Sequence, residues 1–297
     1  MGRESARPAV LPQVLSGAYD ESFSEVAIIA GGKVYRLARE RLGTITDVLV
    51  KETPFGCSTP ILFMEQGDRR FYLLPRHGER EYRVTAPFVN YRANIWALKD
   101  LGTRRIVAWS GPGALDASYR VGDFVLPVDL LDLTRQRPST FFENKGIGIL
   151  RQHHVFCPTL EGALDQVLTE MAIGTRRVVY GVVEGPRLET PAEVRMLQRL
   201  GADVVGMTLA PEGFLARELE MCYHPVAYVT ALAEGVAEHV PMEERERRVD
   251  HALQVMPEIV WNLLEVLPHT PYACSCQDAM LRYKQRGLIG DDFHKWI

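Results

Sequence analysis

Cysteine is scarce in this sequence, charge is nearly balanced, and no long apolar run is present. The 297 residues include five cysteines and carry a formal net charge of −4. Cysteines this few and scattered do not form a disulfide framework, and a near-neutral chain offers no polycationic surface for nucleic acid. No stretch approaches the ~20 apolar residues that cross a membrane, and the N-terminus lacks a basic flank followed by an apolar core. We therefore expect a cytoplasmic protein that binds neither nucleic acid nor a membrane.

Two of the cysteines, Cys274 and Cys276, form a close pair near the C-terminus. No histidine lies at zinc-ligand spacing beside them, so this pair by itself predicts no metal site. One interpretation is a local redox disulfide, and the other is two reduced thiols in a surface loop. The sequence leaves both open.

Apolar side chains, in contrast, are plentiful, and their spacing alternates between that of strands and that of helices. At 46% hydrophobic residues the chain can bury a large core. We predict one α/β domain over residues 23–297, preceded by a tail over residues 1–22 that has no periodicity. Strands are expected over 26–30, 71–74, 105–109, 121–126, 178–183, 203–208 and 223–230, and helices over 89–101, 158–171, 191–200 and 242–267.

The stretch from Gly181 to Glu212 is the most informative part of the chain. It combines a strand, a turn, a helix and a second strand, and the helix start carries a capping box formed by Thr190 and Glu193. Gly201 provides the helix end. The second strand ends in Met207 and Thr208 rather than in more aliphatic residues. Because ligands of α/β proteins bind at such strand ends, we expect this stretch to form half of an active site.

Two other strand ends carry groups suited to an oxyanion. Gly32 and Lys33 follow the first strand, where backbone N–H groups and a lysine could approach an anion, although a plain turn is an alternative. Arg76 and His77 end another strand and offer a bidentate fork with a titratable imidazole, the alternative being a surface turn.

The next strand runs into Ser110, Gly111, Pro112 and Gly113. A hydroxyl and glycines could form the floor of a pocket, but Pro112 removes one backbone donor. The loop over residues 133–144 carries two arginines and two phenylalanines, and long loops of this kind often line sites or subunit contacts.

Four motifs, taken in order, resemble those of the trimeric purine nucleoside phosphorylases, with the 5′-methylthioadenosine phosphorylase branch nearest. They are Arg76-His77-Gly78, the segment 90–98, Glu184-Gly185-Pro186-Arg187 and Gly206-Met207-Thr208. The resemblance covers roughly residues 26–256, and the Cys-x-Cys tail is also similar to one in that branch. It implies a central mixed sheet flanked by helices and a homotrimer or dimer of trimers.

The same resemblance implies phosphorolysis of a purine nucleoside, with inorganic phosphate as co-substrate and neither metal nor organic cofactor. The implied phosphate-binding residues are Gly32, Lys33, Arg76, His77, Ser110 and Thr208, of which Arg76 and His77 are also the catalytic candidates. The implied nucleoside-binding residues are Gly111, Gly113, Leu188, Glu189, Val205, Gly206, Met207 and Ala231, with Met207 beneath the ribose.

This chain departs from the family pattern at three places. A hydroxyl residue of the first phosphate loop is replaced by Lys33, and the pocket floor contains Pro112. Most seriously, the Asp or Asn that assists purine N7 is replaced by Ala231, which cannot donate a proton. Losing a general acid typically costs ~10² to 10⁴ in rate. Glu234 is a catalytic candidate in compensation, or alternatively a carboxylate at a helix start.

Glu189 bears on the choice of base. It matches the family position that accepts a hydrogen bond from N1–H of 6-oxopurines, whereas adenine N1 has no proton to give. The leading hypothesis is a methylthioadenosine phosphorylase. The alternatives are a phosphorylase of methylthioinosine, inosine or guanosine, a degenerate member that binds a flat ligand with little turnover, and an enzyme that hydrolyses the nucleoside with water.

Overall fold

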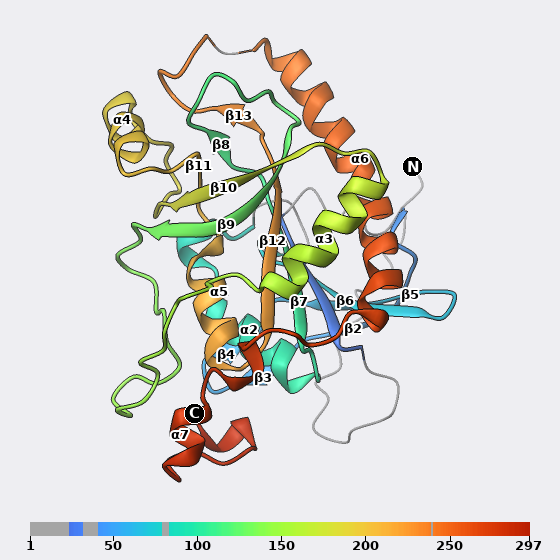
Figure 1. Cartoon of the computed structure of the whole chain (residues 1–297), viewed down its shortest axis with the longest axis vertical. Helices are drawn as coiled ribbons and strands as arrows, with labels where there is room; N and C mark the ends of the chain where they lie inside the picture. The colour runs from blue at the N-terminus through green and yellow to red at the C-terminus, as the bar shows by residue number, and fades with distance from the viewer. Residues whose placement is uncertain (1–23, 32–40, 79–82, 239) are drawn as a thin grey trace, which may run out of the picture.

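A computed structural model describes residues 24–31, 41–78, 83–238 and 240–297. Its centre is an eleven-stranded mixed sheet in the order β13-β8-β11-β10-β9-β12-β7-β1-β6-β5-β2 (Figure 1), and β3 and β4 form a separate pair. The tail over 1–22, Gly32 and Lys33 lie outside the described residues. The strands are β1 Val26–Ala30, β2 Thr44–Leu49, β3 Glu52–Thr53, β4 Gly56–Cys57, β5 Ile61–Gln66, β6 Arg69–Pro75, β7 Arg105–Ser110, β8 Gly113–Ala114, β9 Phe124–Asp132, β10 Thr175–Val182, β11 Val204–Gly206, β12 Cys222–Tyr228 and β13 Ala231–Leu232.

Helices cover both faces of the sheet. They are α2 Tyr91–Asp100, α3 Pro158–Glu170, α4 Pro191–Arg199, α5 Leu209–Glu218, α6 Met242–Val266 and α7 Leu281–Gln285. Along β1, Ala27 and Ile29 pack with α2 and α5, while Ile28 and Ala30 pack with α3 and α6. Successive side chains of a strand point to opposite faces, so a strand buried on both faces is apolar throughout. The predicted single α/β domain with a flanked mixed sheet is confirmed.

The strand directions explain where the site forms. β1 runs parallel to β6 and β7, and β12 runs parallel to β7, so these strands end together. β9, β10 and β11 are parallel to one another, while β12 meets β9 in antiparallel pairing. In Figure 1, β9 and β10 lie crosswise to β12 and β7. The end of β11 therefore approaches the end of β7 from a different direction.

Several elements were not anticipated from the sequence. β2 and β5 form a hairpin-like addition at the edge of the sheet, where an unbroken alternation of strands and helices was expected. Half of the β2 residues are exposed and only Leu49 is fully buried, so the sequence shows no continuous apolar run here. Helix α5 contains Pro211 and Gly213 and has non-helical backbone angles at Ala210. Both residue types disfavour a helix interior, which hides this element from pattern analysis.

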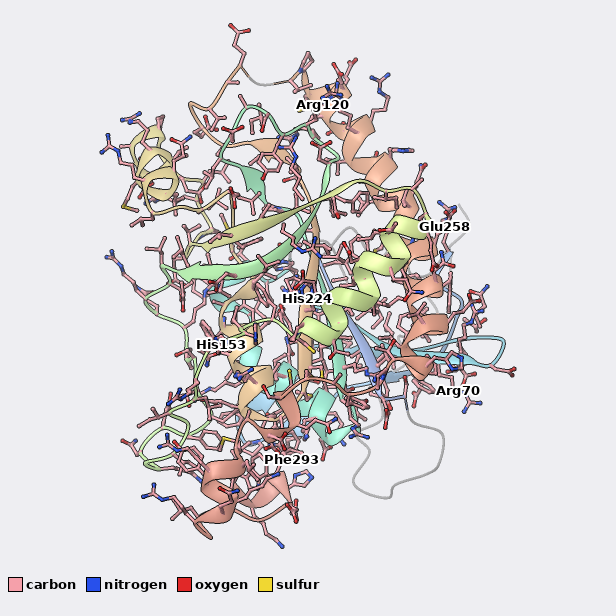
Figure 2. All side chains as sticks on the ribbon, viewed as in Figure 1. Arg70, Arg120, His153, His224, Glu258 and Phe293 are labelled. Atoms are coloured by element: carbon pink, nitrogen blue, oxygen red, sulfur yellow. The ribbon has the colours of Figure 1, made fainter. Side chains whose placement is uncertain are left out.

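The C-terminal segment packs back on the domain. Phe293, labelled in Figure 2, lies with its ring centroid 5.5 Å from that of Trp96 in α2. Arg105 donates to the carbonyl oxygens of Leu267 and Thr270 and stacks on Tyr272 at 4.0 Å. Within the described ranges, no helix is long and apolar enough to cross a membrane.

Candidate active site

Arg76 is fully buried directly after β6 and is held by a carboxylate from α5. Its Nε and Nη2 donate to the two oxygens of Glu212, the second at 2.7 Å, and Nη1 donates to the Trp109 carbonyl oxygen at 3.0 Å. Burial works to lower the pKa of Arg76, but the charge of Glu212 outweighs it, so the net direction is upward. Tyr223 also donates to Glu212, at 2.9 Å. Three of the five guanidinium N–H groups are thus engaged, and the fork is fixed in place.

His77 lies beside this ion pair. Its Nδ1 is 2.8 Å from the carbonyl oxygen of Val84, which can only accept, so Nδ1 carries the proton. Burial, and next the charge of Arg76, lower the pKa of His77 to about 4. The imidazole is therefore neutral at pH 7, and Nε2 is the acceptor atom of the ring. A side-chain carbon placed on Gly31 would come 4.0 Å from the ring, so the end of β1 faces His77.

Two hydroxyls complete the cluster. The Ser110 Oγ at the end of β7 lies 3.5 Å from the Thr208 Oγ1 that follows β11. Ser110 also hydrogen-bonds to the hydroxyl of Tyr180, at 2.8 Å. Tyr180 was not anticipated as a site residue, and burial raises its pKa to about 12. Since Arg76 bonds to the carbonyl that precedes Ser110, the cation, the imidazole and the hydroxyls converge as predicted.

Gly206 leaves room for this arrangement. A side chain at Gly206 would begin 1.8 Å from the hydroxyl oxygen of Tyr180 on the neighbouring strand, which no Cβ can do. Gly185 plays a similar part, since it has a φ of +68° and a Cβ there would come 2.4 Å from the sulfur of Met207. The glycines of both motifs therefore serve the packing of Tyr180 and Met207.

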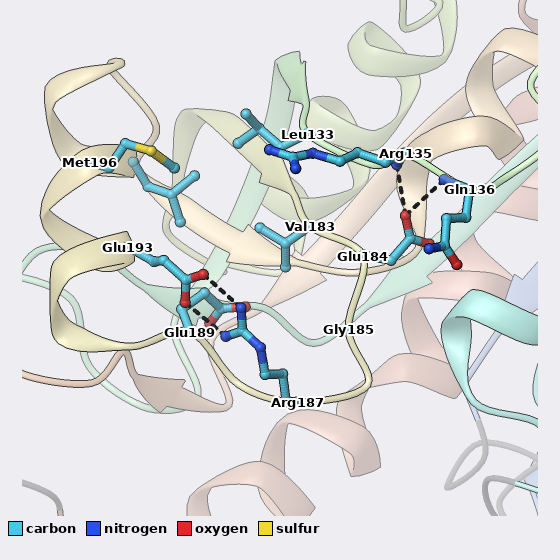
Figure 3. Close-up of a pocket in the computed structure, with 11 residues that line it drawn as sticks. Leu133, Arg135, Gln136, Val183, Glu184, Gly185, Arg187, Glu189, Glu193 and Met196 are labelled. Carbon is cyan, nitrogen blue, oxygen red and sulfur yellow. Dashed lines mark hydrogen bonds and ion pairs between the residues drawn. The ribbon is translucent and has the colours of Figure 1, made fainter.

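A cavity of about 350 Å³ lies along the Glu184–Glu193 turn, beside α4 (Figure 3). The Glu184 carboxylate accepts from the backbone N–H groups of Arg135 and Gln136, at 2.7 and 3.1 Å. Arg187 pairs with Glu193 at the same rim. None of the four phosphate candidates described above lines this cavity, so the cavity is separate from the cluster that they form.

Glu189 lines the same cavity and is half-buried. Burial raises its pKa, and the negative charges of Glu193 and Glu234 raise it further, against the charge of Arg187. Glu234 therefore belongs to the surroundings of Glu189. It occupies a turn after β13, whereas the next helix begins only at Met242, so interpreting it as a helix-start carboxylate is wrong.

Arg137 belongs to the loop over residues 133–144, which the sequence predicted to line a site or a subunit contact, and it connects the cavity to the strand end at Met207. It donates to the side chain and carbonyl oxygen of Glu184, at 2.9 and 2.6 Å, and to the carbonyl oxygens of Met207 and Ala210. Its side chain is almost completely buried. Arg137 therefore fixes the turn at Glu184 relative to the strand end at Met207.

The predicted pocket floor is formed by short strands. Ala231 in β13 pairs with Gly113 in β8. The Thr230 hydroxyl donates to the carbonyl oxygens of Gly111 and Pro112, at 3.1 Å each, and a side chain at Gly111 would come 2.6 Å from Thr230. The floor glycines and Ala231 are thus neighbours, as the nucleoside-binding assignment requires.

Val205 belongs to this floor as well. It pairs with Gly113 in β8, and it is buried against Val194 and Leu197 of α4. Leu188, in contrast, is 66% exposed on the turn. Gly32 and Lys33, the remaining phosphate candidates, belong to the part of the chain that the structure does not describe.

The structure is an α/β protein with a mixed sheet, in which Arg76, His77, Ser110 and Thr208 gather where strands end, the place at which α/β proteins usually bind ligands. A family model described as the Phosphorylase superfamily matches residues 26–265. The chain belongs to this superfamily, which confirms the family inferred from the four motifs.

Similar proteins are named for both kinds of purine, the 6-oxopurines among the relatives and adenine in a solved structure. A protein of Methanothermobacter thermautotrophicus named "Probable S-methyl-5′-thioinosine phosphorylase" is 37% identical over 265 residues, covering 86% of this chain and 88% of the relative. The 6-oxopurine nucleoside phosphorylase of Pyrococcus furiosus is 36% identical over 269 residues, covering 86% and 97%. A solved structure of methylthioadenosine phosphorylase from Schistosoma mansoni with adenine superposes with a TM-score of 0.79 at 26% identity, covering 88% of this chain and 98% of that one.

Proposed function

We propose that this protein catalyses phosphorolysis of purine nucleosides, with 5′-methylthioadenosine as the leading substrate, giving adenine and 5-methylthioribose 1-phosphate. The observation that carries the proposal is the convergence of Arg76, His77, Ser110 and Thr208 beside the floor that carries Gly113 and Ala231. In that arrangement, Arg76 balances the charge of phosphate, and the hydroxyls donate to its oxygens. Positioning the nucleophile and matching its charge are expected to supply most of the acceleration.

His77 has a specific part in this mechanism. A neutral ring with the proton on Nδ1 can accept a hydrogen bond at Nε2 from a protonated phosphate oxygen, which orients the remaining oxygens toward the sugar. No organic cofactor or catalytic metal enters the proposed reaction. Ala231 provides no proton for the departing purine. The proton therefore comes from solvent or from a carboxyl group of the pocket, Glu189 or Glu234.

A phosphate-dependence assay tests the proposal directly. Release of adenine or hypoxanthine is measured from methylthioadenosine, methylthioinosine, inosine and guanosine, with and without inorganic phosphate. We expect turnover that requires phosphate and yields a sugar 1-phosphate. No release from any of the four rejects the enzyme, and equal release in phosphate-free buffer indicates hydrolysis instead.

The pH dependence tests the neutral state of His77. Because its pKa is about 4, we expect no inflection attributable to this ring between about pH 5 and pH 8 in kcat/KM. His77→Asn should lower kcat/KM by roughly tenfold, as expected for one neutral hydrogen bond, without changing the shape of the profile. A wild-type inflection near the ordinary histidine pKa that disappears in the variant would contradict a neutral His77.

A second candidate function, phosphorolysis of 6-oxopurine nucleosides, is favoured by Glu189. An ionised carboxylate there accepts from N1–H of hypoxanthine or guanine. A protonated one donates to N1 of adenine, and the raised pKa of Glu189 keeps that form available to higher pH than usual. The ratio of kcat/KM for adenine nucleosides to kcat/KM for 6-oxopurine nucleosides should therefore rise as the pH falls toward the pKa of Glu189.

Glu189→Gln separates the two bases at fixed pH. We expect kcat/KM for inosine or methylthioinosine to fall about 10- to 100-fold, because a charge-assisted hydrogen bond is lost. Methylthioadenosine should be affected much less, since the glutamine amide can donate to N1. The matched control is Glu193→Gln on the same cavity rim. Equal losses for both bases in Glu189→Gln would rule out contact between Glu189 and N1.

We further propose a cytoplasmic homotrimer or dimer of trimers. Large apolar side chains are exposed at Phe88, Ile149 and Leu188, and surfaces of this kind often mark contacts between subunits. Light scattering on the full chain should give three or six times the 33.5 kDa of the monomer. A monomer mass at assay concentration would remove this part of the proposal.

A further inference from the structure

Four of the five cysteines, widely separated in the sequence, come together in the fold. The sulfur atoms of Cys157, Cys222, Cys274 and Cys276 all lie within 4.8 Å of one another, and all four thiols are free. Three of these residues are buried and Cys274 is partly buried. Cysteines that appeared scattered therefore form one compact cluster, and the Cys-x-Cys pair is neither isolated nor confined to a surface loop.

The four sulfur atoms are held by three separate parts of the chain. Cys157 precedes α3, and its N–H donates to the Tyr223 carbonyl oxygen at 2.8 Å. Cys222 begins β12, and its N–H donates to the Arg104 carbonyl oxygen at 2.9 Å. The C-terminal segment supplies the other two, with Cys276 opening a short 3-10 turn. Two of the ligand positions are thus held by backbone hydrogen bonds that do not involve the C-terminal segment.

We propose that this cluster is a closed tetrathiolate site for one divalent transition metal ion of the zinc class. A tetrahedral zinc ion with Zn–S bonds of about 2.3 Å sets its sulfur atoms about 3.8 Å apart. The sulfur atoms of Cys222 and Cys274 are 3.4 Å apart, and no pair in the cluster exceeds 4.8 Å. Two disulfides would need only two close pairs, whereas here each sulfur is close to the other three.

Positive charge lies next to the C-terminal part of the cluster. Two arginines stack on Tyr272, just before Cys274 in the sequence, with their guanidinium carbons 4.5 and 4.0 Å from the ring centre. They place positive charge near a site whose four thiolates exceed the charge of the metal.

With all four positions filled by protein sulfur, such a site is structural rather than catalytic. It lies between the start of β12, the start of α3 and the C-terminal segment, so its expected role is to fasten that segment to the domain. The inference does not depend on the proposed phosphorolysis.

Metal content of the full chain tests the proposal. The protein is produced with zinc in the medium, purified under a reducing agent and analysed by inductively coupled plasma mass spectrometry. We expect about one ion of zinc or iron per chain in the wild type and in Cys57→Ser, whose exposed thiol lies outside the cluster, and almost none in Cys157→Ser or Cys276→Ser. Chelation should lower the Tm of the wild type and of Cys57→Ser but not that of the cluster variants.

The unmodified chain decides the matter even if a cluster variant fails to fold. Cobalt added to reduced, metal-free protein should give the visible absorption of a tetrahedral thiolate complex, and hydrogen exchange over residues 268–297 should slow when metal binds. Metal-free protein that takes up neither zinc nor cobalt, with four alkylatable thiols or with two disulfides found by peptide mapping, would overturn the proposal.

Discussion

Replacing Ala231 by Asp is expected to raise kcat for phosphorolysis by ~10² to 10⁴-fold, the range that a positioned general acid contributes. Ala231 lies in β13, paired with Gly113 of the predicted nucleoside floor, and is only partly buried. A carboxyl group there can be accommodated at the rim and directed toward the base. The measurement is kcat with methylthioadenosine and with inosine at saturating phosphate.

Ala231→Val is the matched control, because it adds bulk at the same position without a proton donor. We expect no gain from valine and an intermediate gain from Ala231→Asn, which can donate a hydrogen bond to purine N7 but cannot transfer a proton. If the Asp variant stays inactive while the protein binds a purine nucleoside tightly by calorimetry, the chain is a binding protein and not a slowed phosphorylase.

Truncating Glu212 to Ala is expected to cost about 3–5 kcal/mol of unfolding free energy, because it leaves the guanidinium of Arg76 buried without its counter-charge. Tyr223 loses a hydrogen-bond acceptor in the same change. Denaturant unfolding measures the effect. Inorganic phosphate should recover part of the lost stability, since an anion bound next to Arg76 replaces the missing charge.

Glu265→Ala provides the comparison at the surface. Glu265 pairs with Arg69, and their side chains are 54% and 38% exposed. Solvent-exposed pairs contribute about 0–1 kcal/mol. If Glu212→Ala lowers the unfolding free energy no more than Glu265→Ala does, Glu212 does not stabilise the buried guanidinium of Arg76. If Glu212→Ala loses the expected 3–5 kcal/mol of unfolding free energy and phosphate restores none of it, the anion binds away from Arg76.

The sequence was most informative where local signals agree. The capping box of Thr190 and Glu193 is present, and Pro191 begins α4 as expected. Continuous apolar runs made β1 and β6 predictable, because both strands are buried on both faces. Residues at the ends of neighbouring parallel strands could then be expected to meet. For the same reason, the proximity of Arg76, Ser110 and Thr208 could be predicted without coordinates.

What the sequence did not reveal depends on contacts between distant segments. Glu212 is 136 residues from Arg76, and it lies in a helix whose proline and glycine remove the usual periodicity. Tyr180 looked like one more core residue of a strand, because nothing local indicates that its hydroxyl meets Ser110. The cysteines, likewise, could be grouped only once β12, α3 and the C-terminal segment were placed together.

The contact between Gly206 and Tyr180 has a consequence for how this family can vary. Any larger residue at position 206 would clash with the phenol of Tyr180 and displace it. The Ser110 hydroxyl would then lose the hydrogen bond that orients it. The two positions should therefore behave as a covarying pair across homologues, with glycine obligatory wherever the aromatic is kept. A homologue in which the tyrosine is replaced by a smaller residue can carry a larger residue than glycine at position 206. In such a homologue another group has to hydrogen-bond to the serine.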